Sequence, residues 1–205
     1  MPKAADAAIE TALLVLDLQN ERVDAKGKVG AGGLAKIVEE ARLLERVRDV
    51  LEAFRQRGWP VAHIGLAFRA DYADVLSVAP RVAKLKQAGL AVKDTWGTQF
   101  AEKVAPLPSE MVFWKQSVNP FFNTGLLSWL LHRGVRRLVL CGIATHLVVE
   151  SSARFADDAG FAVHVLSDCC VAPDPEAHRH ALERTLPLFG RVTTARDFLD
   201  ELSPR

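Results

Sequence analysis

The chain has 205 residues, with 26 Lys and Arg against 25 Asp and Glu, so its formal net charge is +1. This near balance disfavours a general nucleic-acid binder, which usually carries a basic excess, and no apolar run approaches the roughly 18 residues that suggest a membrane span. Three cysteines, two of them adjacent, disfavour a disulfide framework and fit the reducing cytoplasm better.

Short, nearly all-apolar runs recur along the chain and predict strands buried on both faces, as in a parallel sheet. In chain order, these predicted strands are residues 11–17, 60–68, 111–114, 137–143, 161–168 and a shorter candidate at 191–195. Helical patterns lie between them at 34–57, 124–133, 145–159, 175–186 and 196–202. The stretch 68–110 shows no clear strand, and a connection of this length is often a lid or a binding loop.

Some helix boundaries can be predicted from single residues. Gly58 and Pro60 end the first helical pattern, and Gly134 and Gly160 end the second and third. Asp174 precedes the fourth as a predicted N-cap. The alternation of strands and helices predicts an α/β fold, a three-layer α/β/α sandwich around a mainly parallel, roughly six-stranded Rossmann-like sheet. One domain is expected over residues 1–205.

Three polar features follow predicted strands, where parallel sheets bind ligands. Asp17 ends the first strand, Lys115 follows the third, and a turn at 143–148 opens a helix at Thr145. An ionised Asp facing a Lys can be poised for proton transfer. Backbone N–H groups at the start of the helix could hold an oxyanion or a carboxylate. Without further information, Asp17 could instead be a cap or a structural ion-pair partner, and Lys115 a solvated surface residue.

Three blocks carry a resemblance to a known family. They are ALLVLDLQN, FWKQSVNPFFNTGLLSWL and LVLCGIATHLVVESSARFADDAGFAVHVLSDCCVA. In this order they resemble the isochorismatase-like hydrolases, which include nicotinamidases, carbamoyl-amide hydrolases and isochorismatases. The resemblance implies that Asp17 and Lys115 are catalytic and that a cis peptide joins Ile143 to Ala144, where it shapes an oxyanion site. It also implies a homodimer or a larger homo-oligomer.

The chain departs from this pattern at one position. The family places its nucleophilic Cys three residues after the Thr that matches Thr145, and this sequence has Val148 there. Valine offers no nucleophile, so a covalent thioester route is not expected. Isochorismatases also lack this Cys, and by resemblance they carry a His at the position of His146, although they tend to have a small residue where Val148 stands. Cys141, Cys169 and Cys170 are more consistent with packing than with catalysis.

Other residues are candidates for the substrate site. The turn is expected to contribute Ile143, Ala144, Thr145, His146, Leu147 and Val148. The pocket wall is expected to contain Trp96, Phe121, Phe122 and Gln87, although ordinary packing is about equally compatible with the aromatic residues. No Asp-x-His segment occurs in 17–75 and the His-x-His at 178–180 falls on a predicted helix, so we expect no metal. His63 is expected to be a core histidine, and no cofactor is expected.

These patterns predict a hydrolase that acts on a small carboxylate, amide or vinyl-ether metabolite. Asp17 and Lys115 would form its reactive site, with water as the nucleophile. The alternative is a catalytically silent family member that binds a small ligand or a protein partner. The predicted partner is a small-molecule substrate, with no nucleic acid and no membrane, in the cytoplasm.

Overall fold

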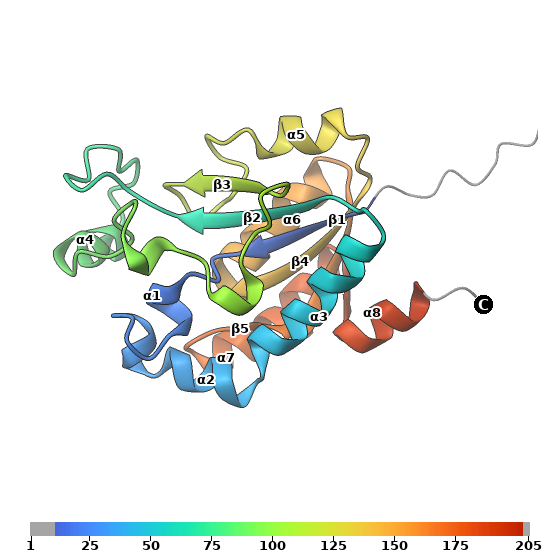
Figure 1. Ribbon diagram of the computed structural model, residues 1–205, viewed down its shortest axis with the longest axis horizontal. Coiled ribbons are helices and arrows are strands. Elements are labelled where there is room, and N and C mark those ends of the chain that lie inside the picture. The colour runs from blue at the N-terminus through green and yellow to red at the C-terminus, as the bar shows by residue number, and fades with distance from the viewer. Residues whose placement is uncertain (1–10, 203–205) are drawn as a thin grey trace, which may run out of the picture.

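The computed structural model describes residues 11–202, which form one sheet covered by helices on both faces (Figure 1). The strands are β1 (Thr11–Leu16), β2 (Val61–Leu66), β3 (Met111–Lys115), β4 (Arg137–Ile143), β5 (Ala162–Val171) and β6 (Arg191–Thr193). Their order across the sheet is β3-β2-β1-β4-β5-β6, and every pair of neighbours is parallel. The predicted α/β fold with a six-stranded, parallel sheet is therefore confirmed.

Helices join the strands and form the outer layers. They are α1 (Asn20–Val23), α2 (Leu34–Glu40), α3 (Leu43–Gln56), α4 (Pro80–Gln87), α5 (Leu126–His132), α6 (Glu150–Asp158), α7 (Pro175–His180) and α8 (Ala195–Glu201). Short 3-10 turns occur at Gly30–Gly32, Trp96–Thr98, Glu102–Val104 and Leu186–Leu188, and π-helical turns at Thr145–Val149 and Ala181–Thr185. None of the helices within residues 11–202 is long and apolar enough to cross a membrane.

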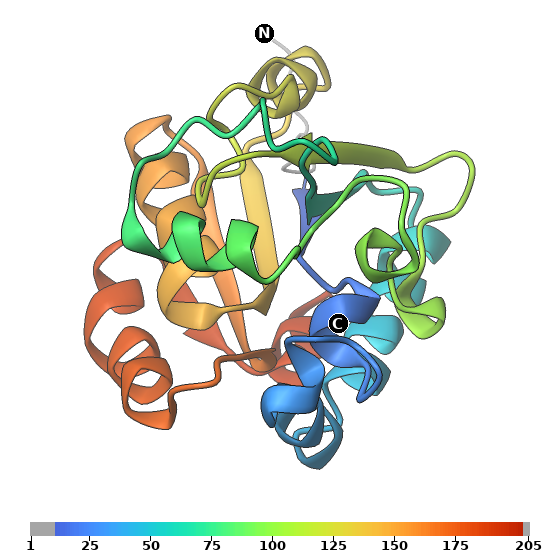
Figure 2. The same ribbon diagram turned by 90° about the vertical axis from the view of Figure 1, so that its left-hand side faces the viewer.

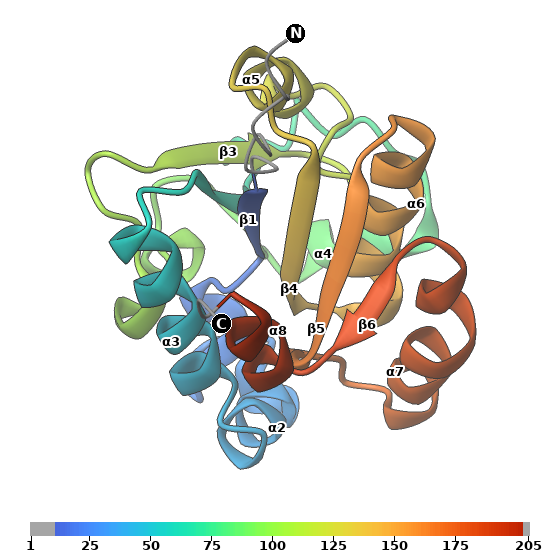
Figure 3. The same cartoon turned by 90° about the vertical axis from the view of Figure 1, so that its right-hand side faces the viewer.

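Alternate residues of β1 point to two different hydrophobic clusters, because successive side chains of a strand point to opposite faces of the sheet. Leu13 and Val15 belong to the cluster that also contains the apolar side of α3 and Phe198 of α8. Leu14 and Leu16 belong to the cluster formed with α5 and α6. Figure 3 shows α3 and α8 on one side of the sheet and α5 and α6 on the other. This burial of both faces explains why the strands lack polar alternation.

Three predicted helices differ from the structure in continuity. The 34–57 pattern is two helices, because Arg42 adopts a left-handed conformation with φ 48° between α2 and α3. The 145–159 pattern begins as a π-helical turn before α6, and the 175–186 pattern ends in π and 3-10 turns after α7. Periodicity did not reveal these changes, because apolar residues keep facing the core across them. Asp174 caps α7 as predicted, since its carboxylate accepts from the N–H groups of Glu176 and Ala177.

The long stretch between β2 and β3 has no strand among its described residues but is not a plain loop. It contains α4 and two 3-10 turns, and an isolated bridge pairs Phe68 with Val92. Figure 2 views the molecule from the carboxyl ends of the strands, where α4 (green) crosses in front of the sheet and α1 (blue) lies nearby. This stretch therefore supplies part of the surface around the strand ends.

Candidate active site

Asp17 and Lys115 meet at the carboxyl edge of the sheet. Asp17 follows β1 and Lys115 is the last residue of β3, and these two strands lie on either side of β2. The Lys115 Nζ donates to Asp17 Oδ2 at 2.9 Å. Both residues are almost completely buried, with 4% and 2% of their surfaces exposed. Asp17 has a left-handed φ of 55°, which Asp adopts more readily than most residues, and its N–H donates to the Ile64 carbonyl. This turn brings the carboxylate across β2 to the lysine.

In the Asp17–Lys115 pair, one carboxylate oxygen and one ammonium N–H make no hydrogen bond to another described residue. Asp17 Oδ1 is buried and has no hydrogen-bond partner among the described residues. The Lys115 ammonium also donates to the Ser117 carbonyl at 3.1 Å, so two of its three N–H groups are used. A buried polar atom without a partner is costly unless water or a ligand satisfies it. The geometry therefore suits the binding of a water molecule or a substrate group beside Asp17 Oδ1.

The electrostatic surroundings of Lys115 are mixed. Burial lowers the pKa of its ammonium, and the adjacent Asp17 carboxylate opposes this effect. Arg22 and Arg81 lower the pKa of Lys115 further, because their positive charges repel the charged ammonium. Among these groups, Asp17 is therefore the one that favours the charged form of the lysine.

The turn after β4 forms the opposite wall of the site. Gly142 has φ 132°, and a Cβ there would lie 2.0 Å from the Leu16 carbonyl oxygen, so only glycine fits beside β1. The Ile143–Ala144 peptide bond is cis. The Ala144 carbonyl then accepts from the N–H groups of Leu147 and Val149. Ile143 and Ala144 at the strand end, and Leu147 and Val148 of the π-helical turn, contribute to the lining of the site.

A cavity of about 170 Å³ connects these elements. Its polar lining consists of Asp17, Arg22, Arg81, Lys115 and Ser117, and its apolar lining of Leu66, Leu85, Val118, Ile143, Ala144, Leu147 and Val148. Val148 is 2% exposed and its carbonyl accepts a hydrogen bond from Ser152 Oγ at 2.6 Å. Mostly apolar walls with a few converging polar groups are typical of small-molecule sites.

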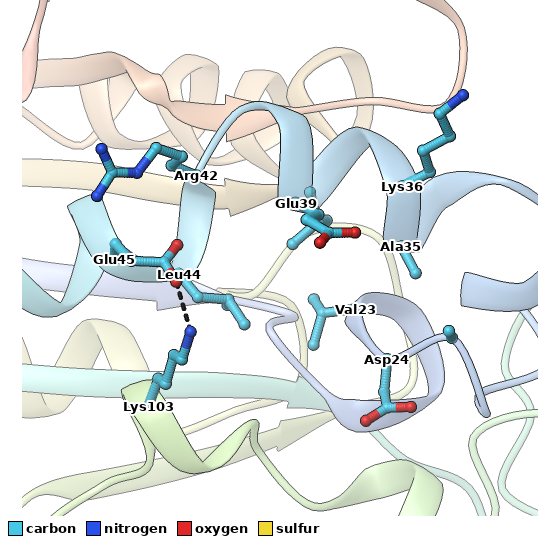
Figure 4. A pocket seen from close by; sticks show the side chains of 11 residues that line it. Val23, Asp24, Ala35, Lys36, Glu39, Arg42, Leu44, Glu45 and Lys103 are labelled. Carbon is cyan, nitrogen blue, oxygen red and sulfur yellow. Dashed lines mark hydrogen bonds and ion pairs between the residues drawn. The ribbon is translucent and has the colours of Figure 1, made fainter.

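A larger hollow of about 640 Å³ lies elsewhere on the surface, among α1, α2 and the start of α3 (Figure 4). Charged side chains of both signs line it, and two of them, Glu45 and Lys103, pair with each other. It contains neither Asp17 nor Lys115. We therefore assign the candidate site to the smaller cavity, because its buried acid and base have unused hydrogen-bonding capacity.

The structure places the predicted turn residues in two groups. Ile143, Ala144, Leu147 and Val148 line the cavity. Thr145 is fully buried and its hydroxyl lies 2.8 Å from His178 Nδ1 on α7, outside the cavity lining. His146 is half-buried, with its Nδ1 lacking a partner among the described residues.

The four predicted wall residues are not among the residues that line this cavity. Phe121 is in the core, stacked on Phe155 with ring centroids 4.5 Å apart. Phe122 and Trp96 are 59% and 45% exposed, and Trp96 lines other surface hollows. Gln87 is exposed at the end of α4. The apolar lining of this cavity is aliphatic and contains no aromatic side chain.

Arg22, Arg81, Ser117 and Gln19 were not predicted at the site. Arg22 lies on α1, only five positions after Asp17, so proximity along the chain was the one available signal. Arg81 lies on α4, whose position depends on tertiary packing. The Gln19 amide bonds to the backbone of Leu66 and Thr98 and holds the segment after Asp17 in place. Within residues 11–202, no group of three His, Cys, Asp or Glu side chains is arranged to hold a metal ion.

Comparison with known proteins connects this geometry to a family. The isochorismatase domain matches residues 11–197. An uncharacterized isochorismatase family protein of Escherichia coli O157:H7, YecD, is 30% identical over 195 residues, which are 94% of this chain and 96% of that protein. The ureidoacrylate amidohydrolase RutB of Cronobacter sakazakii is 30% identical over 209 residues, covering 95% and 89% of the two chains.

Solved structures agree with these sequence matches. An isochorismatase family protein of Burkholderia thailandensis has a TM-score of 0.76 at 29% identity, covering 92% of this chain and 93% of that chain. A family protein of Desulfovibrio vulgaris has a TM-score of 0.82 at 23% identity, covering 95% and 99%, and this match concerns the fold alone. Since the family match spans nearly all of the described chain, the protein belongs to the isochorismatase family and is a hydrolase of that family.

Proposed function

We propose that this protein hydrolyses a small carboxylate, amide or vinyl-ether metabolite at the Asp17–Lys115 pair, with water as the nucleophile. The observation that carries the proposal is the buried, unpartnered Oδ1 of Asp17 beside a cavity of about 170 Å³. Its neighbour Oδ2 is occupied by Lys115, so one oxygen is held in place and the other is available for proton transfer.

Water takes the role of nucleophile because of residue 148. By resemblance to the cysteine-dependent relatives, Val148 stands at the position of the nucleophilic Cys. It lines the cavity, and its side chain has no atom that could attack a carbonyl carbon. The buried thiols at Cys141 and Cys170 do not compensate, since burial raises the pKa of both, that of Cys170 to about 12.

For an amide substrate, ionised Asp17 accepts a proton from water while the water oxygen bonds to the carbonyl carbon. The C=O electron pair moves onto the carbonyl oxygen, and backbone N–H groups in the 144–148 turn stabilise this oxyanion. When the intermediate collapses, the C–N bond breaks and the nitrogen takes the proton from Asp17. The products are a carboxylic acid, or a carbamic acid from a ureido group, and an amine. Lys115 stabilises the charged carboxylate at the start and end of the cycle.

For a vinyl ether, protonated Asp17 first gives its proton to the terminal alkene carbon. Water adds to the resulting oxocarbenium carbon and returns a proton to Asp17. The hemiketal then breaks its C–O bond to give a carbonyl compound and an alcohol. This route starts from a neutral carboxyl group, whereas the amide route starts from the carboxylate that forms the ion pair with Lys115. The geometry therefore supports the amide route better.

The second candidate is a silent family member that binds a ligand without turnover. Its support is again Val148, whose branched side chain occupies space at the cavity wall and is 2% exposed. A buried ion pair costs desolvation energy, so its retention favours the enzyme over the silent binder.

The test is turnover of ureidoacrylate, isochorismate, nicotinamide and simple amides, with Asp17→Ala measured in parallel. Turnover by the parent that is lost in Asp17→Ala supports the proposal, and the active compound identifies the reaction. Turnover that survives in Asp17→Ala contradicts the assignment of Asp17. If the parent turns over none of the panel but binds one of its members at the cavity, the silent binder is favoured.

A further inference from the structure

Two arginines converge on the candidate site from separate elements. Arg22 lies on α1, directly after β1, and Arg81 lies in the first turn of α4, within the long connection between β2 and β3. Both line the same cavity as Asp17 and Lys115. α1 and α4 lie at the carboxyl end of the sheet in Figure 2.

Neither arginine has a partner within residues 11–202. Other arginines pair with carboxylates, as Arg55 does with Glu110 and Arg154 with Glu150. No hydrogen bond or ion pair joins the side chain of Arg22 or Arg81 to another described residue. A guanidinium stays charged at any physiological pH and presents donors that match a carboxylate in a two-point contact. The two side chains are therefore available for an anion.

The charge of the cavity lining is unbalanced. Asp17 is the one acid among the described lining residues, and Lys115 is already paired with it. The two arginines thus leave two positive charges without a counter-charge from the lining. Both lie close enough to Lys115 to disfavour its charged form. A bound anion would relieve this repulsion and strengthen the ion pair at the same time.

The cavity also favours a small anion. Its volume of about 170 Å³ lies below the range of about 300–1,000 Å³ that is common for small-molecule sites. Apart from the charged groups and Ser117, the lining is aliphatic, with Leu66, Leu85 and Val118 among its residues. A ligand that fits has a short carbon skeleton with a charged group at one end.

We propose that Arg22 and Arg81 bind the carboxylate of a small anionic substrate and place its reacting bond beside Asp17, so that the site selects acids over neutral amides of the same size. The placement of the reacting bond rests on the proposed function, whereas the binding of the carboxylate does not. Arg22 and Arg81 are thus substrate-binding residues that determine specificity.

The experiment measures binding without turnover. Malonate, malonamate and malonamide share one skeleton and carry two, one and no negative charges. Isothermal titration calorimetry on the full chain gives the Kd of each compound for the parent, Arg22→Gln, Arg81→Gln and Lys84→Gln. Lys84 is the matched control, because it is exposed on the same helix as Arg81 and outside the cavity lining.

We expect malonate to bind at least roughly tenfold more tightly than malonamide. Each arginine variant should weaken malonate binding roughly ten- to hundredfold, as expected for hydrogen bonds to a charged group, and leave the malonamide Kd unchanged. Lys84→Gln should keep the parent Kd for all three compounds. Circular dichroism spectra establish that each variant is folded before its Kd is compared.

Equal affinity for malonate and malonamide, or arginine variants that match Lys84→Gln, would overturn the inference. Failure of the proposed function gives a different result. In that case the parent binds malonate through both arginines but turns over no compound of the substrate panel. Conversely, hydrolysis of neutral amides with no preference for acids would overturn this inference and leave the proposed function supported.

Discussion

Glu110 and Asp17 carry largely buried carboxylates at opposite ends of the strands, and the two groups differ in their hydrogen bonds. At the amino edge, Glu110 precedes β3 and uses both oxygens: Oε1 accepts from Arg55, and Oε2 accepts from Arg55, His63 and the Leu107 N–H. At the carboxyl edge, Asp17 receives one lysine hydrogen bond on Oδ2, while Oδ1 has no partner among the described residues. Glu110, whose two oxygens both accept hydrogen bonds, joins neighbouring elements of the fold. Asp17 keeps one oxygen that could accept a hydrogen bond from a ligand.

The two sites also differ in how the surroundings balance the cost of burial. Burial raises the pKa of Glu110, but hydrogen bonds from Arg55 and His63 outweigh it and lower the pKa to about 2. Around Asp17 and Lys115, the additional charged groups are Arg22 and Arg81, and both lower the pKa of Lys115 because they repel its ammonium. Stabilising interactions are thus complete at one edge and incomplete at the other, as expected when a site must accept a substrate.

The largest expected difference is in activity. Asp17→Asn keeps the shape of the side chain but removes the proton acceptor, so kcat should fall roughly 10²- to 10⁴-fold on the substrate that the panel identifies. Glu110→Gln makes the same chemical change at the other edge and should leave kcat unchanged, because Glu110 does not line the cavity. Steady-state kinetics of the two variants check this contrast. A comparable loss in both would show that the carboxylates do not have separate roles.

The second difference is in stability. Glu110→Gln leaves Arg55, whose side chain is 23% exposed, without its anionic partner, and breaking this partly buried pair should lower the free energy of unfolding by about 2 kcal/mol. Replacing both members of the other pair, in Asp17→Asn combined with Lys115→Met, should change it by less than about 1 kcal/mol, since no uncompensated charge remains buried. Urea unfolding followed by fluorescence gives both values. A larger loss in the double variant would mean that the Asp17–Lys115 pair also stabilises the fold.

The third difference appears on acidification. The pKa of Glu110 is lower in the folded protein, about 2, than its ordinary 4.5, so its contribution to stability is complete above pH 4.5 and is lost as the pH falls toward 2. In full, a shift of this size corresponds to about 3 kcal/mol, and solvent screening of this partly exposed pair reduces it to about 2 kcal/mol. The gap in unfolding free energy between the parent and Glu110→Gln should therefore narrow from about 2 kcal/mol to near zero across this interval. If this difference in unfolding free energy stays constant with pH, the charge of Glu110 is not its cause.

The smallest effect concerns residue 148. Val148→Cys introduces a thiol at the cavity wall, near the ammonium of Lys115 and the start of the 145–149 turn, where positive charge lowers a thiol pKa. The rate of iodoacetamide modification should rise with a midpoint roughly one unit below the ordinary value near ~8.5. The parent is the control, because its three cysteines are buried. If the modification rate of Val148→Cys has its pH midpoint near the ordinary thiol pKa, the site does not arrange this position as the cysteine-dependent relatives arrange their nucleophile.

The sequence predicted the sheet well because each strand is buried on both faces and therefore reads as a continuous apolar run. It predicted the positions of Asp17 and Lys115 for the same reason, since polar residues at the ends of such runs stand out. It did not predict Arg81 at the cavity or the exposure of Gln87, because both depend on how α4 packs over the strand ends. Phe121 and Trp96, which were expected in the pocket wall, do not line this cavity, and composition gives the character of a side chain but not its direction.

Gln19 has a consequence for how such a protein can evolve. Its side chain pairs with the Leu66 N–H and carbonyl and with the Thr98 carbonyl, so it joins the start and the end of the segment that carries α4. Substitutions between these anchor points can reshape the surface around the strand ends, while the hydrogen bonds of Gln19 hold the segment after Asp17 in place. Under the proposed function, new specificities can therefore arise in this segment by small, independent steps, without changes at Asp17 or Lys115.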